Sequence, residues 1–395
     1  MKITGVIAEY DPFHSGHAFQ LAHARAQGAE TIVVCMSCDT VQRGGLSSVP
    51  PSVRVRAALQ QGADLVVALP APWSCSSAEQ FGASGVHLLS ALGCTTLAFG
   101  AETPDTAALM ALAQALDSPA FAPLLKEELQ GGTPFALARA RAMERFAPAL
   151  APLLNTPNNL LGVEYCKAIL RSGSPMQPLA LPRLGAGHHD SAPAAAEAGA
   201  ATASGSAIRQ FWQSGDWEFM AACVPPQALE LYRAAHAEGL TLSPQRMEVA
   251  LLSRLRAMGE QDFASIRGIG EGLEHRLTAA VRSACTLEEL YSALNTRRYA
   301  LSRLRRLVLD AALGYRQDTP ALPPFLLVLG ARRSALPLCG QASLPCGTSL
   351  AALSRENPSC AAAAAAHGAA ADLSALCRTR PRPMGLAYTQ KPIIL

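Results

Sequence analysis

Residues 3–17 read ITGVIAEYDPFHSGH and contain the clearest indication of the fold in the sequence. Ile3–Ala8 is a short apolar run, which is typical of a strand buried on both faces of a sheet. A polar segment follows and ends in His14-Ser15-Gly16-His17, where a helical pattern begins. The sequence therefore predicts a strand followed directly by a helix, the first unit of an α/β domain.

The next hundred residues repeat this alternation of strand and helix. Short continuous apolar runs separated by helical patterns indicate a doubly wound parallel sheet with helices on both faces. Ligands of such sheets bind at the carboxyl ends of the strands, so we expect the functional site there. The predicted strands cover residues 31–36, 64–69 and 95–99, and the predicted helices cover 17–27, 52–61 and 77–92.

Beyond residue 105 helical patterns prevail, with β-like runs only at 176–181 and 325–329. The alanine-rich residues 339–382 have no clear period, and we predict no structure for them. Three parts are expected: an α/β catalytic domain, a mainly helical domain and a C-terminal segment of uncertain structure. Their predicted bounds are 1–215, 216–320 and 321–395.

The composition indicates a folded, non-membrane protein. Of 395 residues, 33 are Lys or Arg and 30 are Asp or Glu, which excludes a generally polybasic coat. Half of the residues are hydrophobic, which argues against disorder. No run approaches the ~20 apolar residues of a membrane span, and the start turns polar at Glu9, unlike a secretory signal peptide. We therefore expect a cytoplasmic protein.

The cysteines fit that compartment. Eleven is an odd number, and they are scattered along the chain, which does not indicate a disulfide framework. Cys35 and Cys38 have CxxC spacing, but a second close Cys or His pair is missing. We interpret them as ordinary buried or loop thiols.

His14 and His17 are the strongest candidates for chemistry. They lie three residues apart where a turn enters a helix, so both imidazoles can point at one spot. The start of a helix also offers unpaired N–H groups and a positive dipole end. Two donors and helix amides suit a phosphoryl group that gains negative charge during a reaction. The alternative is a pair of capping or surface histidines, which the position after an apolar strand disfavours.

A strand followed by HxGH resembles the nucleotidyltransferase superfamily, whose members cleave ATP between its α- and β-phosphates. A second feature of that superfamily is a Ser/Thr-x-x-Arg element at a helix start, which 204–209 (SGSAIR) fits. The resemblance implies catalytic roles for His14, His17 and Arg209, with Arg209 holding the leaving pyrophosphate. An ordinary surface arginine is the alternative for Arg209.

The segment EYDPFHSGH at 9–17 resembles, more closely, the EYNPFHNGH opening of the bacterial tRNA(Met) cytidine acetate ligases. Matching segments continue in that family's order over residues 1–330. They are 36–37, 41–44, 62–66, 69–70, 77–79, 92–94, 99–102, 157–165, 183–190, 206–209, 271–277 and 296–299.

This resemblance implies a ligase with a two-step reaction on a nucleotidyltransferase-like Rossmann fold. ATP and acetate would give acetyl-adenylate and pyrophosphate, and the acetyl group would pass to N4 of the wobble cytidine of elongator tRNA(Met). Mg²⁺ would be bound through the nucleotide phosphates, without a dedicated metal site in the protein. Nothing in the pattern implies an obligate protein partner or a membrane.

The resemblance also places the ATP contacts. Asn158 could instead cap a helix, and Arg183 could face solvent. The implied ATP-binding residues are Ile7, Ala8, Glu9, Tyr10, Asp11, Pro12, Phe13, His14, Ser15, Gly16, His17, Gln20, Gly100, Asn158 and Arg183.

The chain departs from the family pattern at two places. Cys38-Asp39-Thr40 stands where the family usually continues MSGNF, and Pro51 stands where it tends to carry a lysine. If that lysine contacts phosphate, this protein would bind ATP more weakly or use another basic residue. The candidates are Arg43, Arg54 and Arg56.

A basic cluster near residue 300 is the candidate tRNA contact. If 298–310 is helical, Leu301, Leu304 and Val308 share one face and the arginines fall largely outside it. A solvated helix face is the alternative. The cluster is the densest in a nearly neutral chain, as expected for phosphate contacts, and the family's helical half is thought to bind tRNA. The predicted tRNA-binding residues are Arg297, Arg298 and Arg303.

Two other functions stay open at this stage. One is a nucleotidyltransferase that adenylylates a small cofactor precursor, which would not need the large helical half. The other is a non-catalytic RNA-binding protein with a degenerate ATP site. The intact His14, Gly16, His17 and Arg209 argue against such degeneration.

Overall fold

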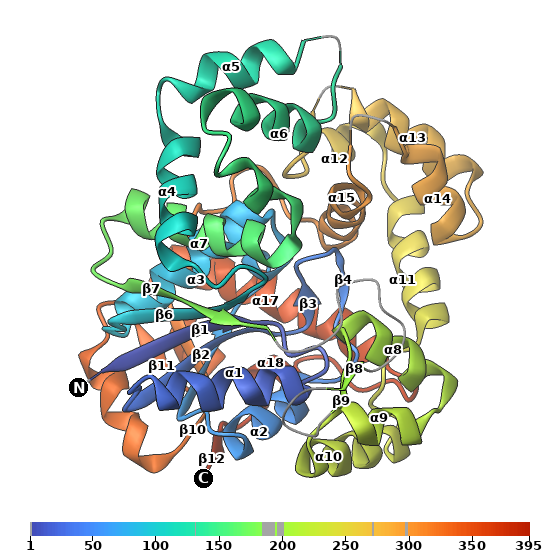
Figure 1. Ribbon diagram of the computed structural model, residues 1–395. Coiled ribbons are helices and arrows are strands. Elements are labelled where there is room, and N and C mark those ends of the chain that lie inside the picture. Colours follow the sequence, from blue (N-terminus) through green and yellow to red (C-terminus); the bar gives the residue numbers. More distant parts are fainter. Residues whose placement is uncertain (1, 131, 184–193, 196–200, 271, 297–298) are drawn as a thin grey trace.

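The computed structural model describes residues 2–130, 132–183, 194–195, 201–270, 272–296 and 299–395. An eight-stranded sheet lies at its centre, in the order β11-β10-β5-β2-β1-β6-β7, with β12 beside β10 (Figure 1). The five consecutive strands from β5 to β7 in that order run parallel, which confirms the predicted doubly wound sheet. They are β1 (Ile3–Ala8), β2 (Thr31–Ser37), β5 (Leu65–Leu69), β6 (Thr96–Ala101) and β7 (Gln177–Pro182).

The order of the strands reverses at β1. From β1 the chain adds β2 and then β5 on one side, and it returns to add β6 and β7 on the other. The carboxyl ends of β1 and β6 therefore flank a topological switch point, where open α/β sheets bind their ligands.

Helices cover both faces of the sheet, and side chains that alternate along the strands enter two different cores. Val6 and Val34 pack with α1 (Ser15–Ala26) and α2 (Pro51–Gln60). Ile7 and Val33 pack on the opposite face, with α3 (Ala78–Ala91) and α7 (Pro157–Ser172). Helices α4 (Thr106–Asp117), α5 (Phe121–Glu128) and α6 (Phe135–Phe146) extend this second layer.

The helices between residues 204 and 313 divide between two clusters. Helices α8 (Gly205–Ser214), α9 (Trp217–Cys223) and α10 (Pro226–Ala237) pack in the same core as α1 and α2. The next five form a separate core: α11 (Pro244–Arg256), α12 (Glu260–Ala264), α13 (Leu273–Ser283), α14 (Leu287–Leu294) and α15 (Leu301–Leu313). The domain boundaries at 215 and 320 stay a prediction. Helices α9 and α10, which follow the boundary at 215, pack on the sheet in the same core as α1 and α2.

The C-terminal segment is folded and completes the sheet. β10 (Leu326–Ala331) pairs antiparallel with β5 and is flanked by β11 (Cys346–Gly347) and β12 (Ile393–Ile394). The expectation of no structure for residues 339–382 is wrong, because they include α16 (Leu350–Leu353) and the 19-residue α17 (Pro358–Leu376). Alanine has the highest helix propensity, and α17 is buried around most of its circumference, so no amphipathic stripe marks it. A short α18 (Leu386–Thr389) packs against it.

Smaller elements connect these layers. They are β3 (Thr40–Val41) with β4 (Gly45–Leu46), β8 (Ala194–Ala195) with β9 (Ala201–Thr202), and the 3₁₀ helices Trp73–Cys75, Ala151–Asn155 and Arg333–Gln341. Cys35 and Cys38 are both buried free thiols. Among the described helices, none by itself is long and apolar enough to cross a membrane; α4 and α5 reach that length only together, across a 75° bend.

Candidate active site

A cavity of about 550 Å³ lies at the switch point, enclosed by the ends of β1, β6 and β7 and the start of α8. Most of the predicted ATP contacts meet in its wall, although Pro12, Phe13 and Ser15 do not line it. The predicted residues that line it are Ile7, Ala8, Glu9, Tyr10, Asp11, His14, Gly16, His17, Gln20, Gly100, Asn158, Arg183 and Arg209.

The two histidines are locked into the first turn of α1. His14 is the N-cap residue, and its Nδ1 accepts a hydrogen bond from the Gly16 amide at 3.1 Å. Nδ1 of His17 accepts from the His14 amide at 3.2 Å, which completes a capping box made of two imidazoles. The rings stack with their centroids 3.7 Å apart. Both histidines therefore cap α1 and also line the cavity.

This geometry assigns the protons on the two rings. An imidazole nitrogen that accepts from an amide carries no proton, so a neutral ring must carry it on Nε2. Burial lowers the pKa of His14 to about 3, helped by the positive charges of Arg183 and Arg209. Burial also lowers the pKa of His17 well below its ordinary value. Both residues thus present a neutral Nε2–H donor on the side away from the helix amides.

The loop before α1 is held from behind by aromatic side chains. The Phe13 amide donates to the Tyr232 hydroxyl at 2.7 Å, and that hydroxyl donates to the Phe13 carbonyl at 3.1 Å. Tyr10, with φ of 48°, places its ring 4.7 Å from that of His17. Phe13 is buried and does not line the cavity, and its two hydrogen bonds with Tyr232 anchor the loop to α10.

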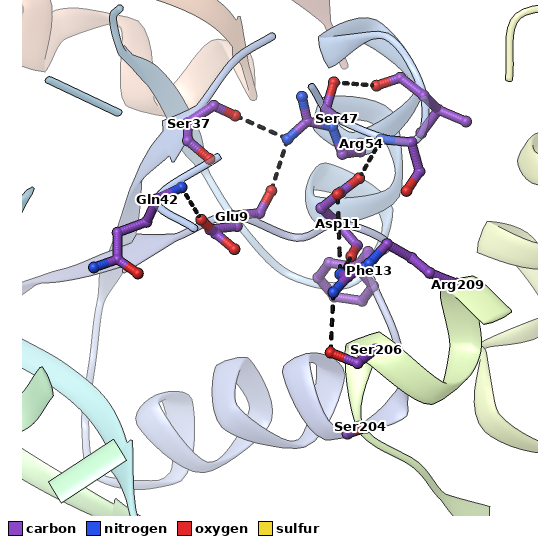
Figure 2. A network of polar contacts seen from close by, with 12 residues as sticks. Glu9, Asp11, Phe13, Ser37, Gln42, Ser47, Arg54, Ser204, Ser206 and Arg209 are labelled. Atoms are coloured by element: carbon purple, nitrogen blue, oxygen red, sulfur yellow. Dashed lines mark hydrogen bonds and ion pairs between the residues drawn. The ribbon is translucent and has the colours of Figure 1, made fainter. Parts of the chain in front are cut away.

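Arg54 is structural. It is fully buried, and its guanidinium donates to the carbonyls of Glu9 and Ser37 (Figure 2). It also donates to the Cys38 carbonyl. Arg56 is exposed and does not line the cavity. Of the three arginines considered as substitutes for a lysine at position 51, Arg43 is the one that lines the cavity wall.

Two carboxylates follow β1 and are both held by backbone amides. The Glu9 carboxylate accepts from the Gln42 amide at 2.6 Å, and the Asp11 carboxylate accepts from the Ser48 amide at 2.7 Å (Figure 2). Burial raises the pKa of Glu9. These bonds tie the residues that follow β1 to the segment 42–48.

Arg209 reaches the same place from α8. Ser204 caps that helix by accepting from the Ala207 amide, which sets the direction of its first turn. Arg209 then donates to the Asp11 carbonyl and to the Ser206 hydroxyl, and lies 4.0 Å from the Asp11 carboxylate (Figure 2). A guanidinium has five N–H groups, so donors remain for an anion in the cavity.

Glu102, which was not among the predicted site residues, supports two residues that line the cavity. Its carboxylate accepts from the Asn158 amide and side chain (3.1 and 2.6 Å), from the Asn159 amide (2.9 Å) and from Arg183 (3.1 Å). Burial alone would raise the pKa of Glu102, but these hydrogen bonds lower it below its ordinary value. Asn158 therefore does not cap α7, and Arg183 is not free in solvent. The signal in the sequence was an acidic residue just beyond the end of a central strand.

Gly100 explains the close approach of Arg183. A Cβ at position 100 would lie 3.2 Å from the Arg183 Cγ. A larger residue at this strand end would press on the arginine that lies over it. The glycine therefore lets Arg183 cross the end of β6 and reach Glu102.

A second, larger cleft of about 1160 Å³ continues from this cavity toward the helical cluster. Both are lined by Glu9, Asp11, Arg43, Ser206 and Arg209. The far wall of the cleft comes from α11, α14 and α15 and includes aromatic and basic side chains. Among them are Tyr291 and Arg305, whose guanidinium lies 5.7 Å from the ring centre of Tyr291.

Of the predicted tRNA contacts, the structure describes Arg303 alone, since Arg297 and Arg298 lie outside the described residues. Arg303 is exposed on α15, with its guanidinium 4.4 Å from the centre of the Tyr299 ring. It does not line the large cleft. Arg306 of the same helix is used internally, donating to the Gln42 carbonyl at 3.2 Å.

Known proteins match this chain over most of its length. The family model named HIGH Nucleotidyl Transferase matches residues 1–337. The tRNA(Met) cytidine acetate ligase of Syntrophomonas wolfei is 33% identical over 84% of this chain and 82% of its own length. The ligase of the same name from Latilactobacillus sakei is 35% identical, over 79% and 77%. That of Bacillus subtilis is 32% identical, over 78% and 75%.

Solved structures agree with the sequence matches. Thermotoga maritima TmcAL bound with alpha-thio ATP superimposes with a TM-score of 0.90 at 25% identity, and the apo form with 0.92 at 26%. Each covers 100% of both chains. The chain therefore belongs to the HIGH nucleotidyl transferase family and, within it, to the tRNA(Met) cytidine acetate ligases.

Proposed function

We propose that this protein is an ATP-dependent ligase that activates acetate as acetyl-adenylate and transfers the acetyl group to N4 of the wobble cytidine of elongator tRNA(Met). The observation that carries the proposal is the pair of neutral imidazoles that line a cavity at the switch point beside Arg209. A relative with the same fold is bound with alpha-thio ATP, which supports ATP as the occupant of this cavity.

In the first step a carboxylate oxygen of acetate attacks the α-phosphorus of ATP, and the bond to the bridging oxygen of pyrophosphate breaks. The α-phosphate gains negative charge on its way to the transition state. His14 and His17 would stabilise that charge with their Nε2–H donors, because neutral donors fixed by the helix need no reorganisation. Arg209 would hold the leaving pyrophosphate. The chemistry requires no proton transfer by either histidine.

Arg183 and Asn158 would contact the nucleotide from the opposite wall. Glu102 positions both, by the four hydrogen bonds described above. We assign Glu102 as a positioning residue, since its carboxylate is occupied by protein donors. Glu102 therefore does not touch the reacting atoms and acts only through Arg183 and Asn158.

In the second step the N4 amine of cytosine attacks the acetyl carbon, AMP leaves, and the amine loses a proton. Cytosine N4 is a poor nucleophile, which explains why an activated acyl phosphate is needed. The large cleft that opens from the ATP cavity provides a route for a nucleotide taken out of its stack. We propose that residues 216–320 hold the tRNA body and that Arg303 contacts a phosphate.

The remaining details of the proposal concern the metal and the compartment. Within the described residues, no group of three or more His, Cys, Asp or Glu side chains is placed to hold a metal ion. We propose that Mg²⁺ enters with ATP, bound through the phosphate oxygens. We also propose the cytoplasm as the place of work, since tRNA and ATP are both found there.

One assay separates this function from its rivals. The protein is incubated with radiolabelled acetate, ATP and total tRNA, and label is followed in the tRNA fraction. Label at a tRNA cytidine is the expected result. Adenylylation of a small metabolite without labelled tRNA would support the cofactor-precursor enzyme instead. RNA binding with neither product would support a degenerate site.

A further inference from the structure

A second cavity of about 430 Å³ lies apart from the ATP cavity, and no residue lines both. Its walls are the start of α2, strand β10, the C-terminal half of α17, and the strap 386–392 that contains α18. The strap is tied down, because the Tyr388 hydroxyl donates to the Ala364 carbonyl at 3.0 Å and the Gly385 amide donates to Asp372 at 2.6 Å. The cavity is therefore a formed part of the fold.

Two buried polar side chains face this space. His367 is only 3% exposed, and its Nδ1 has no hydrogen-bond partner among the described residues. Arg378 is 2% exposed and is held by the Ser47 carbonyl at 2.9 Å and by the Ser374 hydroxyl. Its N–H groups are used within the protein, so its charge adds to the positive potential of the cavity without offering a free donor.

Further positive potential converges on the same cavity. Helix α2 begins here with Pro50 as its N-cap, and no side chain caps its first turn. Arg382 and Lys391 line the cavity as well, and the described residues form no ion pair with either. Of the residues that line it, the one acidic side chain is Asp39, 3.7 Å from Arg378. Three basic side chains thus face one acidic one.

Part of the wall is apolar, beside uncharged polar side chains that include Ser52, Thr348 and Gln390. Leu327, Leu329 and Ala371 form an apolar surface that would pack against an apolar part of a ligand. The volume falls in the range of small-molecule sites, which combine an apolar lining with a few placed polar groups. From these features we propose that the cavity is a second ligand site, which takes a small organic anion with a carboxylate or phosphate head and a short apolar body.

The test is calorimetric titration of the full chain with three probes that share a ring: phenyl phosphate, benzoate and benzyl alcohol. At least one anion is expected to bind at one site, and the neutral alcohol is not. The pair Arg382→Gln and Lys391→Gln should weaken that binding by about tenfold, since two charge-assisted contacts are lost. These side chains are exposed, so folding should be unaffected.

Matched control variants show whether the anion binds in this cavity. The pair Arg333→Gln and Arg355→Gln removes the same charge from exposed positions outside the cavity and should leave the affinity within about twofold. Ala371→Leu, which fills the apolar wall, should weaken binding, whereas His14→Asn in the ATP cavity should not. The proposal is overturned if no anion binds at millimolar concentration, if benzyl alcohol binds as well as the anions, or if the control pair weakens binding as much as the cavity pair.

Discussion

The imidazole of His14 both caps α1 and lines the ATP cavity, so substitution can separate the two contributions. Asparagine at position 14 keeps an acceptor for the Gly16 amide but places no N–H donor where Nε2 stands. His14→Asn is expected to fold normally and to lose pyrophosphate release by about 10²- to 10³-fold, the usual cost of removing one such donor. His14→Ala should lose the same activity and, in addition, about 1 kcal/mol of stability, the value of a helix cap.

Acetate-dependent pyrophosphate release and urea unfolding of the two variants provide the measurements. Binding of tRNA should be nearly unchanged in both, because the imidazole lies in the nucleotide cavity. If His14→Asn released pyrophosphate at the wild-type rate, His14 would be a cap and nothing more.

Stability should depend on pH through the same residue. The pKa of His14 is lowered from an ordinary 6.5 to about 3, so between these values the unfolded chain binds a proton that the folded chain excludes. Stability contributed in this way is complete above pH 6.5 and is lost as the pH falls toward 3. The unfolding free energy of the wild type should therefore fall more steeply from pH 7 to pH 5 than that of His14→Asn. Urea unfolding at intervals of half a pH unit measures this, and parallel curves would show that His14 titrates normally.

Glu102 offers a prediction about positioning. In Glu102→Gln the charge that holds Arg183 and the Asn158 and Asn159 amides is lost. The KM for ATP should rise by roughly three- to tenfold while kcat changes little, since the group contacts no reacting atom. Glu127→Gln, which breaks an exposed pair with Arg145, is the matched control. An equal loss of kcat in Glu102→Gln would mean that the carboxylate acts in the chemistry.

Helix α15 is the element that links the chain to RNA in this account. Charge reversal in Arg303→Glu should raise the apparent KM for tRNA several-fold and reduce the dependence of binding on log[salt] by about one. Acetyl-adenylate formation should be spared. Arg355→Glu, an exposed arginine on the C-terminal segment, carries the same charge change and should have no effect. Equal loss of both half-reactions in Arg303→Glu would instead indicate a folding defect.

The elements differ in how far the sequence predicts them. β1 and α1 follow from an apolar run and a capping turn, which are local signals, and the structure confirms both. Helix α17 has no such signal, because its alanines are helix formers without a polar face, and its burial depends on α11, α15 and α18. The sequence also does not predict the direction of β10, because an apolar run of six residues is compatible with a parallel or an antiparallel strand.

In the whole molecule, the site residues also divide into those with a local sequence signal and those that depend on tertiary contacts. His14, His17 and Arg209 belong to local motifs, and the structure brings them into one cavity as expected. Glu102 and Gln42 bind partners more than thirty residues away in the sequence. No local spacing of residues therefore predicts their roles. Arg54 shows the converse: it was a candidate for phosphate, but three backbone carbonyls from distant segments occupy it. Such roles depend on the tertiary arrangement.

In the proposed mechanism, two neutral imidazoles hold the α-phosphate of ATP while the bond to pyrophosphate breaks. Its most direct test is a crystal structure of this protein with a non-hydrolysable ATP analogue. We expect α-phosphate oxygens within hydrogen-bonding distance of Nε2 of both His14 and His17, and the β- and γ-phosphates beside Arg209. A nucleotide bound elsewhere, or bound with its α-phosphate out of reach of both rings, would contradict it.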